Sequence, residues 1–472
     1  MAVFLAIAAV PLIGFIGIST DTARAWVVKS RLSSAIDAAA LAGGRAFFDA
    51  DRNQVVTMFF NANFPAGYMG ASLSGPAISA NEETEQLQLS ASATIQTAFM
   101  HFFGHSQITV TAAAEVTRQQ VALDVVLSID MSGSMGSSAP GGGTRIEAAR
   151  NAANTLVNIL FGPDTTKEFL NIGLVPWNSK TNITVTGTTF DPALTTTQAV
   201  PAFNNPESPS PNPASPPPPV PQTQVFFANN SPVPLLEAPP ADWKGCVYTR
   251  YKNDGDPNND ADVLKGPITL INGEWAGWQP IGPEGEPVSG WQRCALSVNN
   301  NECTPCLGHG ITPLTNQKQP ITDGINALQS PGGNTNIPQG LGWAWRVLKP
   351  EAPFTEAILN PPYKRKQAIV LLSDGENVPG SGDGYKATWG TGGFAQTQMN
   401  NRLVTLANNI KADGVIVYVI QFANSGTELQ NLLKQVASGP AAPYYHFAPD
   451  AATLQGVFTE IANHLSELRL SK

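Results

Sequence analysis

The chain of 472 residues is too long for one hydrophobic core, so two or three structural units are expected. Only 13% of the residues are charged and the net charge is -9, which argues against a basic surface and against nucleic acid as a partner. A composition rich in Ser, Thr and Asn and poor in Lys favours a protein outside the cytoplasm.

The first residues form an uncharged segment. Residues 1–20 read MAVFLAIAAVPLIGFIGIST, which is long enough to cross the hydrocarbon core of a bilayer as a helix. A buried core helix and a cleaved signal peptide are the alternatives, but GISTDTA at the end of the segment is a poor cleavage site. The nearest basic residues, Arg24, Lys29 and Arg31, follow the segment, so the positive-inside rule alone would place that side in the cytoplasm. We predict a transmembrane helix at 1–20.

Residues 21–118 continue the helical pattern and then change to alternation. The stretch ARAWVVKSRLSSAIDAAALAGGRAFF is rich in Ala and Leu and ends near Gly43 and Gly44. Together with the first segment it predicts one helix of about 45 residues, roughly 70 Å long. Two later stretches, LQLSASATIQTAF and ITVTAAAEVT, alternate apolar and small polar residues, which indicates strands that pack on this helix. We therefore predict a pilin-like extension helix with short strands.

From residue 119 strands alternate with helices, which is typical of a parallel sheet covered on both faces. Strands are expected at 121–130, 168–179, 364–375, 415–422 and 444–449, and helices at 144–161, 321–329, 341–348, 398–414, 427–437 and from 450 onward. The predicted fold is α/β, with a doubly wound, mostly parallel sheet formed by 119–189 and 320–472. In such a sheet a ligand site lies at the carboxyl ends of the strands.

Polar side chains gather at these strand ends. Asp130, Ser132 and Ser134 follow the first strand in IDMSGSMG, Asp374 follows a later strand in LLSDG, and Thr335 stands in the loop GGNTNIPQGL. Carboxylates and hydroxyls suit Mg²⁺ first, with Mn²⁺ or Ca²⁺ as alternatives, rather than zinc or copper. Two negative charges would leave the cation partly unneutralised, so it could accept a carboxylate from a partner protein. The alternative is a helix cap or turn rich in Ser and Gly.

The DxSxS motif after an apolar strand, the threonine loop and the later SDG resemble the metal-ion-dependent adhesion site of von Willebrand factor A domains. That resemblance implies that Asp130, Ser132, Ser134, Thr335 and Asp374 hold a divalent cation directly or through water. It also implies that an acidic residue of a partner takes the open position of the cation.

The whole chain resembles TadG-like proteins of the tight adherence (Flp) pilus system, whose N-terminal segment is TadE/TadG-like. The segments DAAALAGG and GLGWAWRVL carry this resemblance, together with the apolar first helix. It implies a single-pass protein of the bacterial inner membrane, with the bulk of the chain in the periplasm or outside the cell. Its implied role is assembly or anchoring of the pilus, with another pilus or cell-envelope component as the partner.

Residues 190–319 interrupt the A domain as an insertion. Its first part, NNPESPSPNPASPPPPVPQTQ, cannot pack a core and should be extended or disordered. All four cysteines lie in this insertion, and an oxidising compartment favours disulfides. Of three possible pairing schemes we favour Cys246 with Cys294 and Cys303 with Cys306, because these loops do not cross. A zinc site at CTPCLGH with His309 is the alternative, although the spacing of a zinc finger is missing.

The same insertion carries polar residues at alternate positions, as calcium loops do: Asp254, Asp256, Asn258, Asp260 and Asp262. Asn259 and Lys265 depart from the EF-hand pattern at its glycine and glutamate positions, so a solvated acidic loop is the simpler interpretation.

The sequence offers little support for a catalytic site. His101 and His105 in HFFGH lack the glutamate of HExxH and lie in the pilin-like part, so we expect no enzyme and no metal there. Two functions remain in view: an adhesion or assembly module that binds a partner through its cation, and a structural pilus component whose ion only stabilises the fold.

Overall fold

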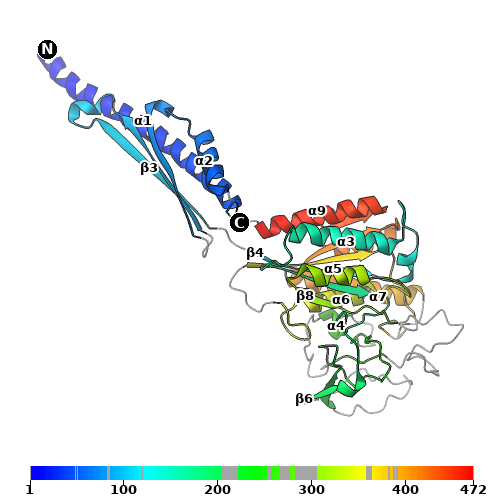
Figure 1. The fold of residues 1–472 in the computed structure, drawn as a ribbon. Helices are drawn as coiled ribbons and strands as arrows, with labels where there is room; N and C mark the ends of the chain where they lie inside the picture. Colours follow the sequence, from blue (N-terminus) through cyan, green and yellow to red (C-terminus); the bar gives the residue numbers. More distant parts are fainter. Residues whose placement is uncertain are drawn as a thin grey trace. The chain divides into compact units, whose positions relative to one another are not determined.

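The computed structural model describes residues 2–47, 49, 51–81, 86–117, 121–203, 222–251, 257–264, 277–281, 306–357, 364–380, 383–385, 389 and 392–470. The chain divides into two compact units, an N-terminal unit of residues 1–119 and a C-terminal unit of residues 120–471. Each is described by itself (Figure 1).

The N-terminal unit is built on one long helix, α1 (Ala2–Arg45), as the sequence predicts. Val28, Leu32, Ile36 and Ala39 recur at helical spacing and are fully buried against a sheet. A Cβ atom at Gly43 would lie 2.6 Å from Leu87 of that sheet, so only glycine permits this close approach.

The predicted membrane segment at 1–20 falls partly on residues 1–13, whose side chains lie outside the described part of the chain. Within the described residues, no helix has both the length and the apolar character needed to span a membrane.

Three antiparallel strands cover α1 in the order β1 (Ser72–Asn81), β2 (Gln86–Gln96), β3 (Gln107–Thr117) (Figure 1). The strands β2 and β3 confirm the prediction, whereas β1 and the helix α2 (Arg52–Asn63) were not predicted. Two short 3₁₀ helices, η1 (Tyr68–Gly70) and η2 (Met100–Phe103), lie in the connections. His101 and His105, in and just after η2, are exposed.

The C-terminal unit confirms the α/β fold class. Its six-stranded sheet has the order β11 (Tyr445–Ala448), β10 (Ile416–Phe422), β9 (Lys364–Ser373), β4 (Val121–Asp130), β5 (Leu170–Trp177), β8 (Thr312–Thr315). All neighbouring strands are parallel except β8, which pairs antiparallel with β5 and was not predicted. This edge strand falls within the range assigned to the insertion.

Helices cover both faces of the sheet (Figure 1). One layer contains α3 (Arg145–Phe161), α5 (Lys318–Ala327) and α9 (Ala451–Leu470), and the other contains α6 (Ile337–Leu348), α7 (Gly393–Ala412) and α8 (Thr427–Val436). Alternate residues of β4 enter the two cores: Leu127 packs in the first and Val126 in the second. Every residue of β4 is buried, so its last residue is held rigidly.

The insertion contains a strand pair, β6 (Thr196–Phe203) with β7 (Gln222–Phe227), and the short helix α4 (Ala261–Leu264). Residues 204–221 of the proline-rich stretch lie outside the described residues. The structure pairs Cys246 with Cys306, so both predicted pairings are wrong, since each assigned one of these two cysteines to another partner. Cys294 and Cys303 lie outside the described residues.

Two acidic residues of the predicted calcium loop, Asp260 and Asp262, make buried contacts with arginines. Asp254 and Asp256 lie outside the described residues. Asp262 is buried and accepts hydrogen bonds at 2.7 Å from Arg250 and from Arg346 of α6, and Asp260 pairs with Arg402 of α7. Neither a calcium loop nor a solvated loop therefore describes these two aspartates. They fasten the insertion to α6 and α7.

Candidate metal centre

Asp130 stands at the carboxyl end of the central strand β4, where the parallel neighbour β9 also ends. The register aligns Ile129 with Leu372, so Asp130 lies beside Ser373. The Ser373 hydroxyl donates a hydrogen bond of 2.8 Å to Asp130 Oδ2, and the Ser132 backbone N–H donates one of 2.7 Å to Oδ1. The carboxylate is fully buried, and both of its oxygens are oriented by short hydrogen bonds.

The two predicted serines lead from Asp130 to Asp374. Ser132 precedes a 3₁₀ turn, η3 (Gly133–Gly136), which brings Ser134 back toward the sheet. The hydroxyls of Ser132 and Ser134 lie 3.1 Å apart, and Ser134 Oγ donates a bond of 2.6 Å to Asp374 Oδ1. Four of the five predicted side chains thus belong to one connected hydrogen-bonded group.

Thr335 reaches the same place from the loop before α6. Asn336 caps that helix by accepting a bond from the Gln339 N–H, and this fixes the preceding residue. A Cβ atom at Gly375 would lie 3.7 Å from both Thr335 Oγ1 and Ser134 Oγ, so the two hydroxyls face the same small space. The structure therefore brings all five predicted residues to one rim of the sheet.

Backbone contacts tie the threonine loop to the DxSxS loop. The Gly133 N–H donates to the Gly333 carbonyl at 2.9 Å, and the Gly332 N–H donates to the Met131 carbonyl at 2.9 Å. A Cβ atom at Gly133 would lie 3.3 Å from the Gly333 oxygen, which is tighter than an ordinary contact. Glycine at position 133 permits this approach.

Arg145 is a charged member of the rim that no sequence motif indicated. It is the first residue of α3, and its Nη1 donates a hydrogen bond of 2.7 Å to Asp374 Oδ2. A basic residue in the first turn opposes the helix dipole, so it favours a position beside a carboxylate. That unfavourable placement, directly after the Thr144 cap, was the signal that could have revealed it. Ser373 was also missed, because a serine that ends a strand carries no distinctive pattern.

The electrostatics of the rim favour a bound cation. Burial and the neighbouring charge of Asp374 raise the pKa of Asp130 to about 7, because two carboxylates share a site with little access to water. A divalent cation would remove this repulsion. The donor set consists of carboxylate and hydroxyl oxygens, which are the ligands that Mg²⁺, Mn²⁺ and Ca²⁺ prefer. The residues present therefore fit a hard divalent ion.

The other candidate sites show no metal-binding cluster where the structure describes them. Among the described residues, no group of three or more His, Cys, Asp or Glu side chains could hold a metal ion. Cys306 is in a disulfide, and the ring of His309 hydrogen-bonds to the Gln329 carbonyl, so two residues of the alternative zinc site at CTPCLGH are engaged elsewhere. Cys303 lies outside the described residues. The cation at the rim would rely on hydroxyl ligands besides its two carboxylates.

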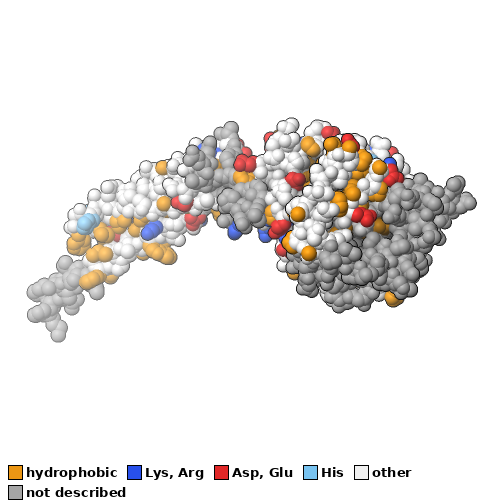
Figure 2. All heavy atoms as spheres, turned by 90° about the horizontal axis from the view of Figure 1, so that it is seen from below, with side chains coloured by type: hydrophobic (Ala, Val, Ile, Leu, Met, Phe, Trp, Pro, Cys, Tyr) orange, Lys and Arg blue, Asp and Glu red, His pale blue; other side chains and the backbone are white. Residues whose placement is uncertain are grey.

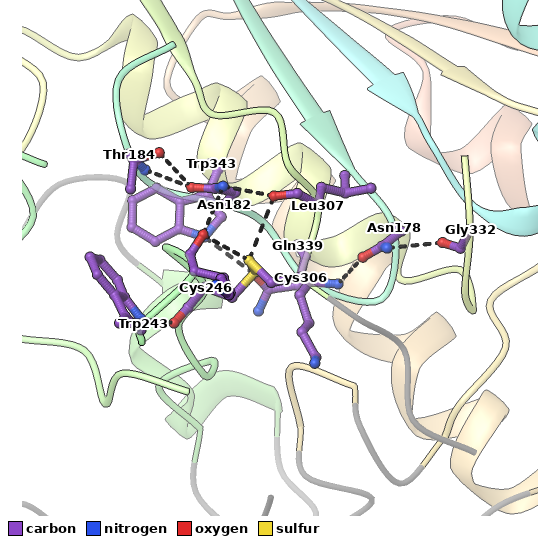
Figure 3. Close-up of a disulfide and its surroundings, with 12 residues drawn as sticks. Asn178, Asn182, Thr184, Trp243, Cys246, Cys306, Leu307, Gly332, Gln339 and Trp343 are labelled. Carbon is purple, nitrogen blue, oxygen red and sulfur yellow. Dashed lines mark hydrogen bonds between the residues drawn. A yellow bond between two sulfur atoms is a disulfide. The ribbon is translucent and has the colours of Figure 1, made fainter. Parts of the chain in front are cut away.

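The disulfide of the insertion lies close to the loop after β5, and that loop contacts the threonine loop (Figure 3). Asn182, four residues after Asn178 in the loop that follows β5, donates to the carbonyls of Leu307 and Lys244, beside Cys306 and Cys246. Asn178 donates at 2.9 Å to the Gly332 carbonyl of the threonine loop. A short path of hydrogen bonds and covalent bonds therefore joins the disulfide to the loop that carries Thr335.

Residues 1–46 match the family model described as putative Flp pilus-assembly TadE/G-like. No curated protein matches the chain. The chain is similar to the von Willebrand factor domain of the type V pili tip protein Mfa5 from Porphyromonas gingivalis, with 12% identity, 75% of this chain and 97% of that one covered, and a TM-score of 0.36.

Two further solved structures are similar to this chain. The pilus adhesin SpaC from Lactobacillus rhamnosus GG shares 12% identity over 82% of this chain and 34% of its own, with a TM-score of 0.34. Proximal thread matrix protein 1 from the mussel byssus, with a zinc-occupied MIDAS motif, shares 12% identity over 74% of this chain and 49% of its own, with a TM-score of 0.32. In both cases the match covers less than two thirds of the solved protein's own length. The TadE/G-like character expected from the sequence is confirmed for the N-terminal segment.

Proposed function

We propose that this chain is a membrane-anchored, extracytoplasmic component that assembles or anchors a Flp/Tad pilus, and that it binds an acidic group of a partner through a divalent cation. The observation that carries the proposal is that five oxygen-bearing side chains lie together at one rim of the sheet: Asp130, Ser132, Ser134, Thr335 and Asp374. The role is one of binding, without a catalytic step.

Two observations support a location in the cell envelope. The TadE/G-like match covers residues 1–46, and the first 20 residues carry no charge, which supports a single helix in the inner membrane. The Cys246–Cys306 disulfide suits an oxidising compartment, which supports a periplasmic or external position for the rest of the chain.

At the rim, Mg²⁺ is the first candidate and Mn²⁺ and Ca²⁺ are the alternatives. The ion would supply positive charge and an open coordination position for a carboxylate of another pilus or envelope protein. The protein contributes two oriented carboxylates and three hydroxyls, and the backbone contact of Gly133 with Gly333 holds the loops together.

The test is calorimetric titration of the full chain in detergent with Mg²⁺, Mn²⁺ and Ca²⁺, beside the variant Asp130→Ala. We expect wild-type binding that the variant loses while its circular dichroism is unchanged. The same variant, returned to cells that lack the protein, should fail to support pilus assembly. Assembly at the wild-type level by a variant that binds no cation would refute the adhesion role.

The second candidate is a structural pilus component whose ion only stabilises the rim. The observation in its favour is that the carboxylates already have partners: Asp374 accepts from Ser134 and Arg145, and Asp130 accepts from Ser132 and Ser373. In that case Asp130→Ala should lower the melting temperature in the presence of Mg²⁺ and leave pilus assembly intact.

A further inference from the structure

Exposed aromatic side chains gather at one end of the N-terminal unit. Phe102 and Phe103 of η2 are 76% and 60% exposed, and Phe15 of α1 is 73% exposed. Figure 2 shows hydrophobic side chains concentrated over this end of the unit. A soluble surface rarely leaves several large apolar side chains together in water, so this cluster indicates a contact surface.

The loop that carries Phe102 and Phe103 contacts α1 between Gly14 and Asp21. A Cβ atom at Gly17 would lie 2.6 Å from Phe99 Cβ, and one at Gly14 would lie 3.4 Å from Phe103 Cζ, so the loop rests on two glycines of the helix. Just beyond, the buried Asp21 carboxylate accepts bonds of 2.9 Å from the backbone N–H groups of 98, 99 and 100. The loop that carries Phe99, Phe102 and Phe103 is therefore held against the helix.

In the same part of α1 the uncharged residues end and charged residues begin. Residues 1–20 carry no charge, and Asp21 and Arg24 are the first charged side chains. A shallow hollow of about 630 Å³ beside the helix shows the same change from apolar to charged residues. Phe15 and Ile16 line one end of it and Arg24 lines the part towards the other end. Phe side chains beside a charged stretch are one of the features by which a surface inserts into the boundary between lipid headgroups and acyl chains.

We propose that Phe15, Phe99, Phe102 and Phe103 form an aromatic collar that lies in the interfacial layer of the lipid bilayer. The loop at 98–103, distant in sequence from the anchor, would then set how deeply the helix sits and stop it from sliding. This inference rests on the membrane anchor of the proposed function. The occupant of the surface is lipid, and a second copy of this chain is the competing occupant.

Tryptophan quenching tests the collar. Trp26 is the one tryptophan of the N-terminal unit in the sequence, so Trp26→Phe removes the local signal and leaves a constant background from the C-terminal unit. In that background, Phe102→Trp places a probe in the collar. Met58→Trp is the matched control, because Met58 is 59% exposed on α2, beside the other end of α1. The full chain is reconstituted in phosphatidylcholine vesicles that contain a lipid brominated near the headgroup end of its acyl chains.

We expect the vesicles to float with the protein, the probe at position 102 to be quenched and the probe at position 58 to be unaffected. Adding Gly17→Ile, which displaces Phe99, should reduce the quenching at 102. Flotation without quenching at 102 overturns the collar and leaves the anchor standing, and cross-linking between copies through that position would assign the surface to a second chain. Absence of flotation overturns the anchor and the collar together.

Discussion

Arg145 brings a positive charge to the rim, because its guanidinium lies 2.7 Å from the buried Asp374 carboxylate, which would also face the cation. Its guanidinium repels a divalent ion and at the same time pairs with Asp374. The two effects oppose each other, and substitution separates them.

We expect Arg145→Gln to lower the melting temperature of the ion-free protein, because Asp374 would lose its partner at a cost of about 3 kcal/mol. The same variant should bind Mg²⁺ about tenfold more tightly, since a positive charge close to the ion is gone. Calorimetry and thermal melts with and without Mg²⁺ measure both. Arg145→Lys, which keeps the charge, is the control; weaker binding by the Gln variant would show that Arg145 only maintains the fold.

Asp21 gives the N-terminal unit a defined response to acid. Desolvation raises the pKa of Asp21, but the hydrogen bonds from the backbone of Ala98, Met100 and Phe99, with the charge of Arg24, outweigh it and lower the pKa below 3.8. A lowered carboxyl pKa stabilises the folded form above pH 3.8, and this contribution is lost as the pH falls through the folded value.

Hydrogen exchange of the 98–100 amides should therefore accelerate below about pH 4, relative to the intrinsic rate. In Asp21→Asn, protection of these amides should be weaker at neutral pH and show no such step. Equal pH dependence in both proteins would exclude Asp21 as the cause.

At the scale of elements, the Cys246–Cys306 disulfide closes a loop of 60 residues and is joined through Asn182 and Asn178 to the threonine loop. The double variant Cys246→Ser/Cys306→Ser should lose about 4 kcal/mol of unfolding free energy, the chain-entropy value for a loop of this length. It should also bind Mg²⁺ more weakly, because the loop of Thr335 is less restrained. Urea unfolding and calorimetry test this. Unchanged Mg²⁺ affinity in a destabilised variant would show that the disulfide does not reach the rim.

The helix α4 is held to α6 by a buried ion pair, which makes Asp262 a second test at this scale. Asp262→Asn should cost about 3–5 kcal/mol of unfolding free energy, because Arg250 and Arg346 are fully buried and would lose their anion. Asp323→Asn on the surface of α5 is the control, with an expected change below about 0.5 kcal/mol. Urea unfolding at neutral pH measures both variants, and similar values would mean that the ion pair contributes little.

At the scale of the whole molecule, the division into two compact units predicts two unfolding transitions. Mg²⁺ at about a hundred times its dissociation constant should stabilise the C-terminal unit by about 2.7 kcal/mol and leave the other transition in place. Scanning calorimetry of the full chain with and without Mg²⁺ resolves this. A single transition that shifts as a whole would show that the units unfold together.

The central sheet and the common rim of the five predicted side chains could be predicted from the sequence because they depend on local patterns. The continuous apolar run of β4 and the loops that follow β4 and β9 placed Asp130 and Asp374 at the same edge. The missed elements lack such patterns: β8 has only four residues, and β1 contains Gly75 and Pro76 at an irregular register. The disulfide was mispredicted because sequence order does not decide which cysteines meet across a folded insertion.

The central strand also has a mechanical consequence. The C-terminal unit begins at residue 120, and β4 starts at Val121 and ends at Asp130. A force applied between Val121 and the rim at Asp130 would act along β4 and load the parallel ladders with β5 and β9 in shear, so that many hydrogen bonds share the force at once. Under such a force the geometry at Asp130 would persist until both ladders slip together, and the proposed binding of a partner at the rim would persist with it.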